Sequence, residues 1–355
     1  MKRKFKAYYR PSDDEKRSAM KDAYIIFDTN ALIDILRLSP DLSDKTLGII
    51  EKHKASIRIP QHVAWEYHRH VLATSAEMFA MIENTRRNFD FEPLNKALKS
   101  QLTDDGNNNR FPKDCLNRCT GELLESFKKI QILLQNLEEY YRLSFINQGI
   151  QTRVSELLGD CLMDGLSQEY IAGKEAEWQT RYDKKTPPGY KDADKNDNKF
   201  GDLIIWNEIL DIAKKDNKNI VFVSNDLKED WLLRLSGKTW GPRIELLEEF
   251  DNYTGHTGKM LLIYSLDQFL KQVDEDDIFN EADLSIISEQ SQTVTDTKKH
   301  EEDIKQRESI KSILIDSSEN DWEEERVSCN VKSQKISFED NYTMPVKDTI
   351  KSTIE

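Results

Sequence analysis

Residues 23–30 read AYIIFDTN, and this stretch decides the fold. Its first five residues are a short β-rich apolar run, which the polar residues Asp28, Thr29 and Asn30 end abruptly. Leucine and isoleucine then recur at helical spacing over residues 32–36. The pattern predicts a buried strand that leads directly into a helix, with Asp28 at the carboxyl end of the strand.

Three more short apolar runs follow, at residues 56–60, 219–224 and 261–265. Short apolar strands that alternate with helices indicate a parallel sheet covered on both faces. From about residue 75 to 180 the chain is helical throughout, which predicts a helical insertion. Trp65, Trp206 and Trp231 lie in apolar helical patterns and are predicted to be core residues. We therefore predict a three-layer α/β domain over residues 23–270, with a central parallel sheet that the insertion splits in sequence.

The charges of the 355-residue chain are unevenly distributed. The chain has 51 basic and 65 acidic residues, a net charge of −14, but residues 271–355 contribute 11 basic and 22 acidic residues to these totals. The remaining 40 basic and 43 acidic residues leave the body almost neutral, so nucleic acid stays open as a partner. We predict a basic arm over residues 1–22, a polar loop over 182–199 and an acidic tail that is largely disordered or dependent on a partner.

Cysteine spacing and hydropathy limit the class of protein. The four cysteines have no paired C-x-x-C spacing, which argues against a disulfide scaffold and a zinc ribbon. No apolar stretch approaches the roughly 18 residues of a membrane span. We expect a cytoplasmic protein that does not associate with a membrane.

Acidic residues gather where the predicted sheet would bind a ligand, outside the carboxyl ends of its strands. Asp28 and Asp226 each follow a strand, Glu66 lies one turn into the helix after the second strand, and Asp202 opens the helix before the third. Asp230 lies one turn beyond Asp226. Gathered carboxylates repel one another unless cations lie between them, and oxygen ligands favour Mg²⁺ or Mn²⁺. Two such ions can clamp the attacking water and the leaving oxygen of a phosphodiester, which is nuclease chemistry.

Together with Glu66, several segments resemble the PIN-like domain nucleases, and in particular a bacterial branch with a large helical insertion. The core segments are FDTN at 27–30, GDLIIW at 201–206, FVSND at 222–226 and KEDW at 228–231. Two outer segments resemble the same branch, PPGYKD at 187–192 and PRIELLEEF at 242–250. The resemblance spans about residues 23–270, and its segments are specific jointly rather than singly.

By position, the resemblance implies a role for each matching residue. The catalytic, metal-binding acids would be Asp28, Glu66, Asp202 and Asp226, with Asp230 as an auxiliary metal ligand. Asn30 and Ser224 would orient a carboxylate or a water. Apart from the resemblance, Lys191 and Arg243 are candidate phosphate contacts, and the alternative is that they are ordinary surface residues. One departure is Asn225, which stands where similar sequences often have a second acid and leaves Asp226 alone at that strand end.

The resemblance also implies an activity. We expect a metal-dependent endonuclease that uses one or two Mg²⁺ or Mn²⁺ ions and acts on RNA in preference to DNA. Similar sequences often look like toxins or phage-defence effectors. The insertion and the tail are the natural places for a regulatory protein partner or for self-association into a homo-oligomer.

Two other functions fit part of the pattern. A haloacid-dehalogenase-like phosphatase also has an Asp after its first strand, but it needs a second Asp two residues later, where this chain has Asn30. A catalytically silent PIN-fold scaffold or RNA-binding module is the non-enzymatic alternative. The full set of four acids argues against it.

Overall fold

A three-stranded parallel sheet organises the protein. The computed structural model describes residues 1, 5–94, 96, 113–147, 149–195, 197–226 and 228–291. The sheet has the order β1-β2-β5, from β1 (Ala23–Phe27), β2 (Asn219–Val223) and β5 (Leu261–Tyr264). The predicted strand at 56–60 pairs only through isolated parallel bridges, one of which joins Ile25 and Ile57.

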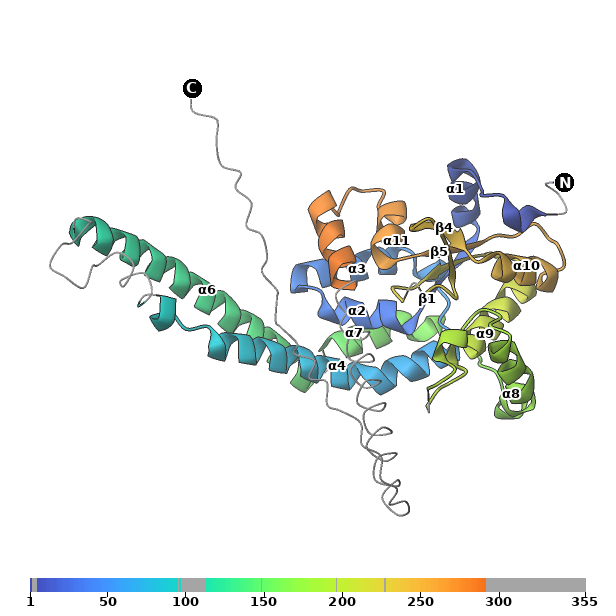
Figure 1. Cartoon of the computed structure of the whole chain (residues 1–355), viewed down its shortest axis with the longest axis horizontal. Coiled ribbons are helices and arrows are strands. Elements are labelled where there is room, and N and C mark those ends of the chain that lie inside the picture. Colours follow the sequence, from blue (N-terminus) through green and yellow to red (C-terminus); the bar gives the residue numbers. More distant parts are fainter. Residues whose placement is uncertain are drawn as a thin grey trace, which may run out of the picture. The chain divides into compact units, whose positions relative to one another are not determined.

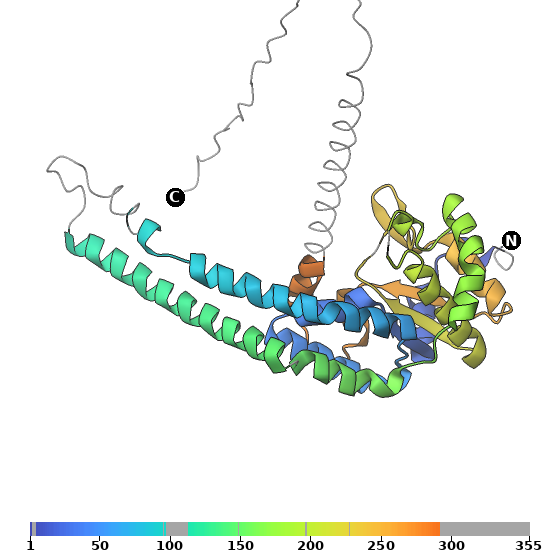
Figure 2. The ribbon, with the colours of Figure 1, turned by 90° about the horizontal axis from the view of Figure 1, so that it is seen from below.

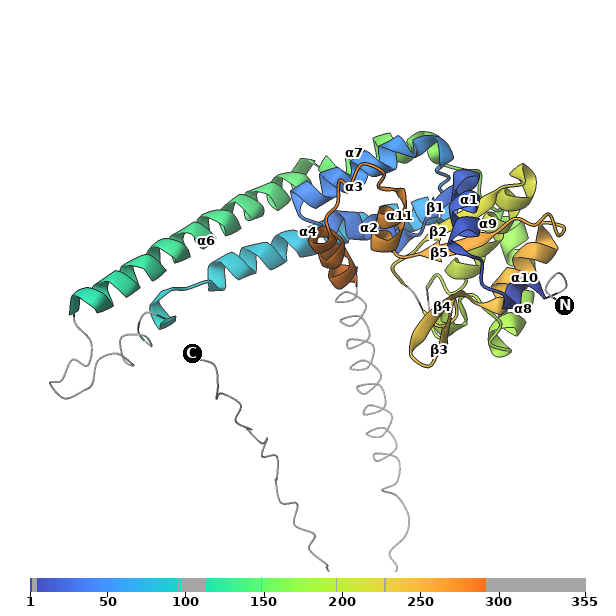
Figure 3. The same ribbon diagram turned by 90° about the horizontal axis from the view of Figure 1, so that it is seen from above.

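Helices cover both faces of the sheet, as Figures 1 and 3 show, with α2, α3 and α11 on one side and α9 and α10 on the other. The α-helices of the described part of the chain are α1 (Asp13–Lys21), α2 (Thr29–Arg37), α3 (Pro40–Lys52), α4 (Gln61–Asn88), α6 (Lys113–Asn147), α7 (Gly149–Leu158), α8 (Gln168–Asp183), α9 (Gly201–Asp216), α10 (Ile244–Tyr253) and α11 (Leu266–Val273). Short 3₁₀ helices are η1 (Lys6–Tyr8), η2 (Lys54–Ser56), η3 (Gly159–Cys161) and η4 (Tyr190–Asp192). The predicted three-layer α/β architecture is confirmed.

Large apolar side chains fill the space between the layers. Phe27 of β1 packs edge-on against Phe269 of α11, with ring centroids 5.4 Å apart. On the other face, Phe222 of β2 packs against Trp231, whose ring also contacts Trp206 of α9. Burial of such large apolar surfaces is the main favourable term that holds the layers together.

The helical insertion is a long hairpin of α4 and α6 that extends away from the sheet (Figures 2 and 3). At its outer part Phe89 stacks on Phe127, with ring centroids 4.3 Å apart. At its base the outgoing and returning chains are joined, because Ile59 N donates to Cys161 O at 2.9 Å and Met163 N donates to Ile59 O at 3.0 Å. A hydrogen bond from Tyr141 Oη to Leu38 O, at 3.2 Å, ties α6 to the domain, and Tyr140 of α6 packs against the core.

A second, two-stranded sheet was not predicted. It is an antiparallel hairpin of β3 (Leu232–Leu235) and β4 (Lys238–Pro242). Residues of the expected N-terminal arm reach it, since the Arg10 guanidinium donates to the carbonyls of Thr239 and Trp240 and lies over the Trp240 ring. The exposed positions of β4 explain why its sequence carries no apolar strand signal.

The expected start of the tail near residue 271 falls inside α11. Residues beyond α11 continue to pack on the domain, with Phe279 and Ile287 buried in the core and Lys45 paired with Asp283. Residues 292–355, which hold most of the expected acidic tail, lie outside the described residues. Within the described part, no helix is both long enough and apolar enough to cross a membrane.

Candidate active site at the carboxyl edge of the sheet

Asp28 lies at the carboxyl end of β1 and starts α2. Its backbone N–H donates to Val223 O at 2.8 Å, which continues the pairing with β2 by one residue. Its Oδ1 accepts the Thr29 N–H at 2.8 Å, as a helix N-cap does. Its Oδ2 accepts hydrogen bonds from Ser224 Oγ at 2.7 Å and from the Asn30 amide. Asn30 and Ser224, for which the resemblance implied an orienting role, therefore contact this carboxylate directly.

Glu66 faces the same edge from the first turns of α4. Thr29 Oγ1 donates to its Oε2 at 2.5 Å, and the Asn198 amide donates to its Oε1. Burial pushes the pKa of Glu66 upward, but hydrogen bonds from His62, Thr29 and Asn198 outweigh it, so the net pKa lies below its usual value. Gly201 leaves room for this arrangement, because a Cβ there would lie 2.9 Å from Glu66 Oε1. Glu66 is thus held as a carboxylate.

Asp202 and Asp230 accept hydrogen bonds from neighbouring segments of the domain. Asp202, in the first turn of α9, accepts a hydrogen bond from Trp231 Nε1 at 3.3 Å. Asp230 is fully buried, and its Oδ2 accepts the backbone N–H groups of Gly189 at 3.0 Å and Lys191 at 3.4 Å. Its Oδ1 has no hydrogen-bond partner in the part of the chain that the structure describes. Burial raises the pKa of Asp230.

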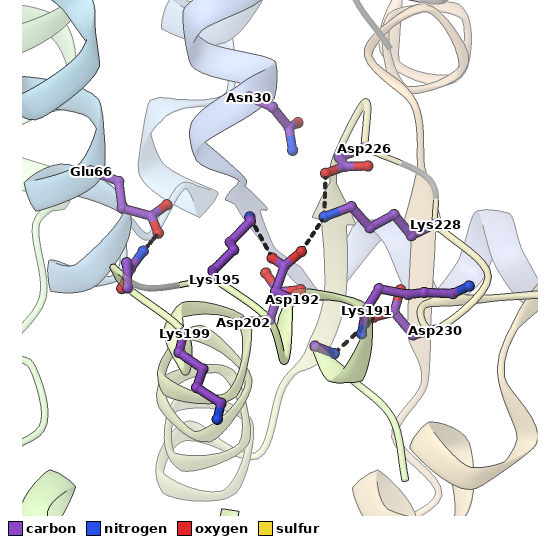
Figure 4. Close-up of polar contacts among 12 residues, drawn as sticks. Asn30, Glu66, Lys191, Asp192, Lys195, Lys199, Asp202, Asp226, Lys228 and Asp230 are labelled. Atoms are coloured by element: carbon purple, nitrogen blue, oxygen red, sulfur yellow. Dashed lines mark hydrogen bonds and ion pairs between the residues drawn. The ribbon is translucent and has the colours of Figure 1, made fainter. Parts of the chain in front are cut away.

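Asp226 belongs to a row of alternating charges, shown in Figure 4. Lys228 Nζ lies 3.0 Å from Asp226 Oδ2 and 3.0 Å from Asp192 Oδ1, and Lys195 Nζ lies 2.7 Å from Asp192 Oδ2. Burial alone would lower the pKa of Lys228, but Asp226, Asp202 and Asp192 outweigh it and raise the pKa. Lys228 is therefore an ammonium ion among carboxylates.

The acids act on one another electrostatically. Burial raises the pKa of Asp28 to about 7, and the charges of Glu66 and Asp226 add to the rise. Burial also raises the pKa of Asp202 well above its usual value; Lys228 opposes this rise, and Asp192, Asp28 and Asp230 reinforce it.

All five predicted acids are therefore brought to one edge of the sheet, where their charges are mutually unfavourable. Across residues 1, 5–94, 96, 113–147, 149–195, 197–226 and 228–291, no three His, Cys, Asp or Glu side chains are grouped closely enough to hold a metal ion.

A comparison with protein families agrees with this architecture. The model of a family described as PIN like domain matches residues 24–246, which is more than half of the chain. The chain belongs to the PIN-like domain family. No curated protein and no solved structure matches it. The match begins at β1 and ends in α10, so it includes all five predicted acids of the PIN-like domain.

The sequence of this PIN-like domain did not identify three polar residues of the candidate site at the carboxyl edge of the sheet. Asp192 and Asn198 lie in the polar loop over residues 182–199, where acidic and amide residues are common and carry no periodic signal. Lys228 lies two residues after Asp226, a spacing that does not by itself indicate contact. The structure identifies them by their contacts. The Asn198 amide donates to Glu66, and Lys228 Nζ lies between Asp192 and Asp226.

Lys191 and Arg243, the candidate phosphate contacts, are both engaged by acids of the domain. Lys191 Nζ lies 2.5 Å from Glu229 Oε1. The Arg243 guanidinium pairs with Glu245 at 2.6 Å and donates to Glu229 O at 3.1 Å. A phosphate would have to compete with these carboxylates for either cation.

The three tryptophans do not share one environment. Trp206 and Trp231 are core residues, as expected, with 0% and 5% of their surface exposed. The prediction for Trp65 was wrong, since 47% of its surface is exposed and its ring lies beside His62 and Arg69. Trp65 immediately precedes Glu66 on α4, so the turn that points Glu66 inward points Trp65 outward.

The Asn225 side chain connects two helices and does not point to the acids of the candidate site; its hydrogen bonds go to Asp34 and Leu266. Its Nδ2 donates to Asp34 Oδ2 at 2.8 Å, and its Oδ1 accepts the Leu266 N–H at 2.8 Å. The side chain therefore links α2 to the start of α11. An acid at this position would set two buried carboxylates against each other, because the donor to Asp34 would be lost.

Asn225→Asp is expected to lower the free energy of unfolding by about 1–3 kcal/mol, since one buried carboxylate loses a donor and gains a like charge. Urea unfolding at pH 8 measures it. Asn252→Asp, on the exposed surface of α10, is the matched control and should change the stability little. Unchanged stability together with tighter Mn²⁺ binding would assign Asn225 to the site.

The loop that carries Asp192 is fixed by a polar cluster behind it. Arg181 Nε donates to Pro187 O at 3.0 Å, and Arg181 Nη1 pairs with Glu249 Oε1 at 2.7 Å. Trp206 Nε1 donates to Glu249 Oε2 at 2.9 Å. Arg181 thus links the two outer segments of the resemblance, at 187–192 and 242–250.

Proposed function

We propose that the chain is a metal-dependent nuclease that hydrolyses phosphodiester bonds, with RNA favoured over DNA. The observation that carries the proposal is the geometry of the carboxyl edge of the sheet, where hydrogen bonds hold both oxygens of Asp28 and both oxygens of Glu66. Burial beside Glu66 and Asp226 also raises the pKa of Asp28 to about 7, so this carboxylate is costly to ionise without a cation. Membership of the PIN-like domain family supports the same reaction class.

The chemistry of the donor set, although not its spacing among the described residues, suits a hard divalent ion. Asp28, Glu66, Asp202, Asp226 and Asp230 offer only carboxylate oxygens, which are the ligands that Mg²⁺ and Mn²⁺ prefer. When bound, such an ion would supply Lewis acidity at the phosphate and activate a water molecule. Asp230 Oδ1, buried and without a hydrogen-bond partner among the described residues, is an acceptor that a cation would satisfy.

The chain's own residues would prepare the site. Asn30 and Ser224 hold one oxygen of Asp28, and the Thr29 N–H holds the other, so that the carboxylate is oriented before a ligand arrives. Thr29 and Asn198 hold Glu66 in the same way. Such preorganisation lowers the cost of bringing the carboxylates together around a cation.

A cleavage assay tests the proposal. The full chain is incubated with single-stranded RNA, single-stranded DNA and a phosphomonoester, with Mn²⁺, Mg²⁺ or EDTA. We expect metal-dependent cleavage of a polymer, with RNA cut faster than DNA, and no cleavage in EDTA. Phosphate release from the monoester alone would favour the haloacid-dehalogenase-like phosphatase, and silence with every substrate would favour the scaffold.

The biological setting proposed from the resemblance is a toxin or antiviral defence effector of the cytoplasm. A regulatory protein or a second copy of the chain, bound through the insertion or the tail, remains a prediction. On α6 the apolar side chains of Ile130, Ile132 and Leu133 are exposed, which gives such a partner apolar surface to cover.

A further inference from the structure

Lys228 lies between two carboxylates of the candidate active site. Its Nζ is 3.0 Å from Asp192 Oδ1 and 3.0 Å from Asp226 Oδ2 (Figure 4). The Lys228 side chain is 29% exposed and that of Asp192 13% exposed, so the contact with Asp192 is largely withdrawn from water. Asp192 comes from η4 and Asp226 from the end of β2, so the ammonium joins two separate segments of the site.

A single cation that bridges two carboxylates is the arrangement that a divalent ion would otherwise provide in an acid-rich site. Here the ammonium provides it. Asp202 lies beside Asp192 in Figure 4, so the same positive charge also offsets a third acid. With Lys228 in place, Asp192 and Asp226 have less attraction left for an incoming ion.

Other lysines near the site do not have this arrangement. Among the described residues Lys195 forms an ion pair with Asp192 alone, and its side chain is 49% exposed. Lys191 contacts Glu229, and both side chains are largely exposed. Exposed pairs of this kind contribute little to stability and are readily exchanged for water.

The inference rests on the proposed function. We propose that Lys228 is a built-in cation that neutralises the Asp192 and Asp226 side of the site. The protein therefore binds one divalent ion in place of a pair.

The test counts bound Mn²⁺. The full chain is titrated with Mn²⁺, and binding is monitored by calorimetry and by the electron paramagnetic resonance signal of free Mn²⁺. The wild type should bind one ion. Lys228→Met, which removes the charge and keeps the length of the side chain, should bind two ions. Lys195→Met removes a charge from the same Asp192 and is the matched control; it should bind one ion, as should Lys228→Arg.

Thermal unfolding gives an independent readout. Loss of Lys228 leaves Asp226 without its cation and Asp192 with Lys195 alone, so Lys228→Met should melt at a lower temperature than the wild type in EDTA. Millimolar Mn²⁺ should raise its melting temperature by more than that of the wild type, because an ion that binds only the folded state stabilises it.

The outcomes separate this inference from the proposed function. Two ions bound by the wild type, or the same number and affinity in the wild type and Lys228→Met, would overturn the role of Lys228. If Lys228→Met does not fold, the wild type and Lys228→Arg decide: one ion in each supports the role, and any other count overturns it. Absence of polymer cleavage by the wild type, with the difference in ion number intact, would remove the nuclease activity and leave the role of Lys228 standing.

Discussion

Asp28→Asn is expected to reduce polymer cleavage at least about 1,000-fold, which corresponds to roughly 4 kcal/mol of transition-state stabilisation. The substitution keeps the shape of the side chain and removes the charge that would hold a divalent ion. Initial rates with single-stranded RNA and Mn²⁺ measure the effect. Asp164→Asn, at an exposed position between the bridge residue Leu162 and α8, is the control and should keep wild-type activity.

The same variant should be more stable than the wild type when no metal is present. In the folded protein the pKa of Asp28 is about 7, against an ordinary value of 3.8, so the folded state holds an extra proton between these pH values. The wild type therefore loses stability as the pH rises from about 4 to about 7, whereas Asp28→Asn is spared this loss. Urea unfolding in EDTA should show a gain of about 1–2 kcal/mol at pH 8 and little gain at pH 4. Wild-type cleavage by the variant, or equal stability of both proteins at pH 8, would remove Asp28 from the centre of the site.

Gly189→Ala is expected to lower the free energy of unfolding by about 3 kcal/mol. Gly189 has a φ of 84°, in the left-handed region that side chains disfavour. A Cβ there would also lie 2.5 Å from Tyr182 Oη and 2.9 Å from the Cβ of Asp202. Because the Gly189 N–H also holds Asp230, relief of these contacts would shift two acids, and cleavage should fall by about 100-fold.

Gly173→Ala is the matched control for Gly189→Ala. Gly173 lies inside α8, and a Cβ there would meet no atom within 4 Å. Its replacement should stabilise the protein by roughly 0.5–1 kcal/mol, because alanine favours a helix more than glycine does. Equal unfolding free energies for Gly189→Ala and the wild type would show that the loop can move away from Asp202 without cost.

Local sequence signals sufficed for the elements that build the sheet. The apolar runs at 23–27, 219–223 and 261–264 are strands of the structure, because a parallel strand buried on both faces must be apolar throughout. The hairpin of β3 and β4 could not be found in this way. Its second strand is mostly exposed, so hydrophobicity does not mark it.

The candidate site was predictable only in part. Strand ends and helix starts are fixed by local sequence, so Asp28, Asp202 and Asp226 could be assigned to one edge. The contacts of Asp192 and Lys228 depend on how a polar loop folds back, which no periodic pattern encodes. Trp65 was misplaced because the apolar residues around it do not reveal which face of α4 turns away from the domain.

The closed base of the α4–α6 hairpin has an evolutionary consequence. Hydrogen bonds among Ile59, Cys161 and Met163 fasten the chain where it leaves the domain and where it returns, and Tyr141 adds one clamp further out. Beyond these anchors the two helices mainly support each other. Natural selection can therefore lengthen, trim or replace this arm as a module, and so alter what it recognises, while the acids at its root keep their positions.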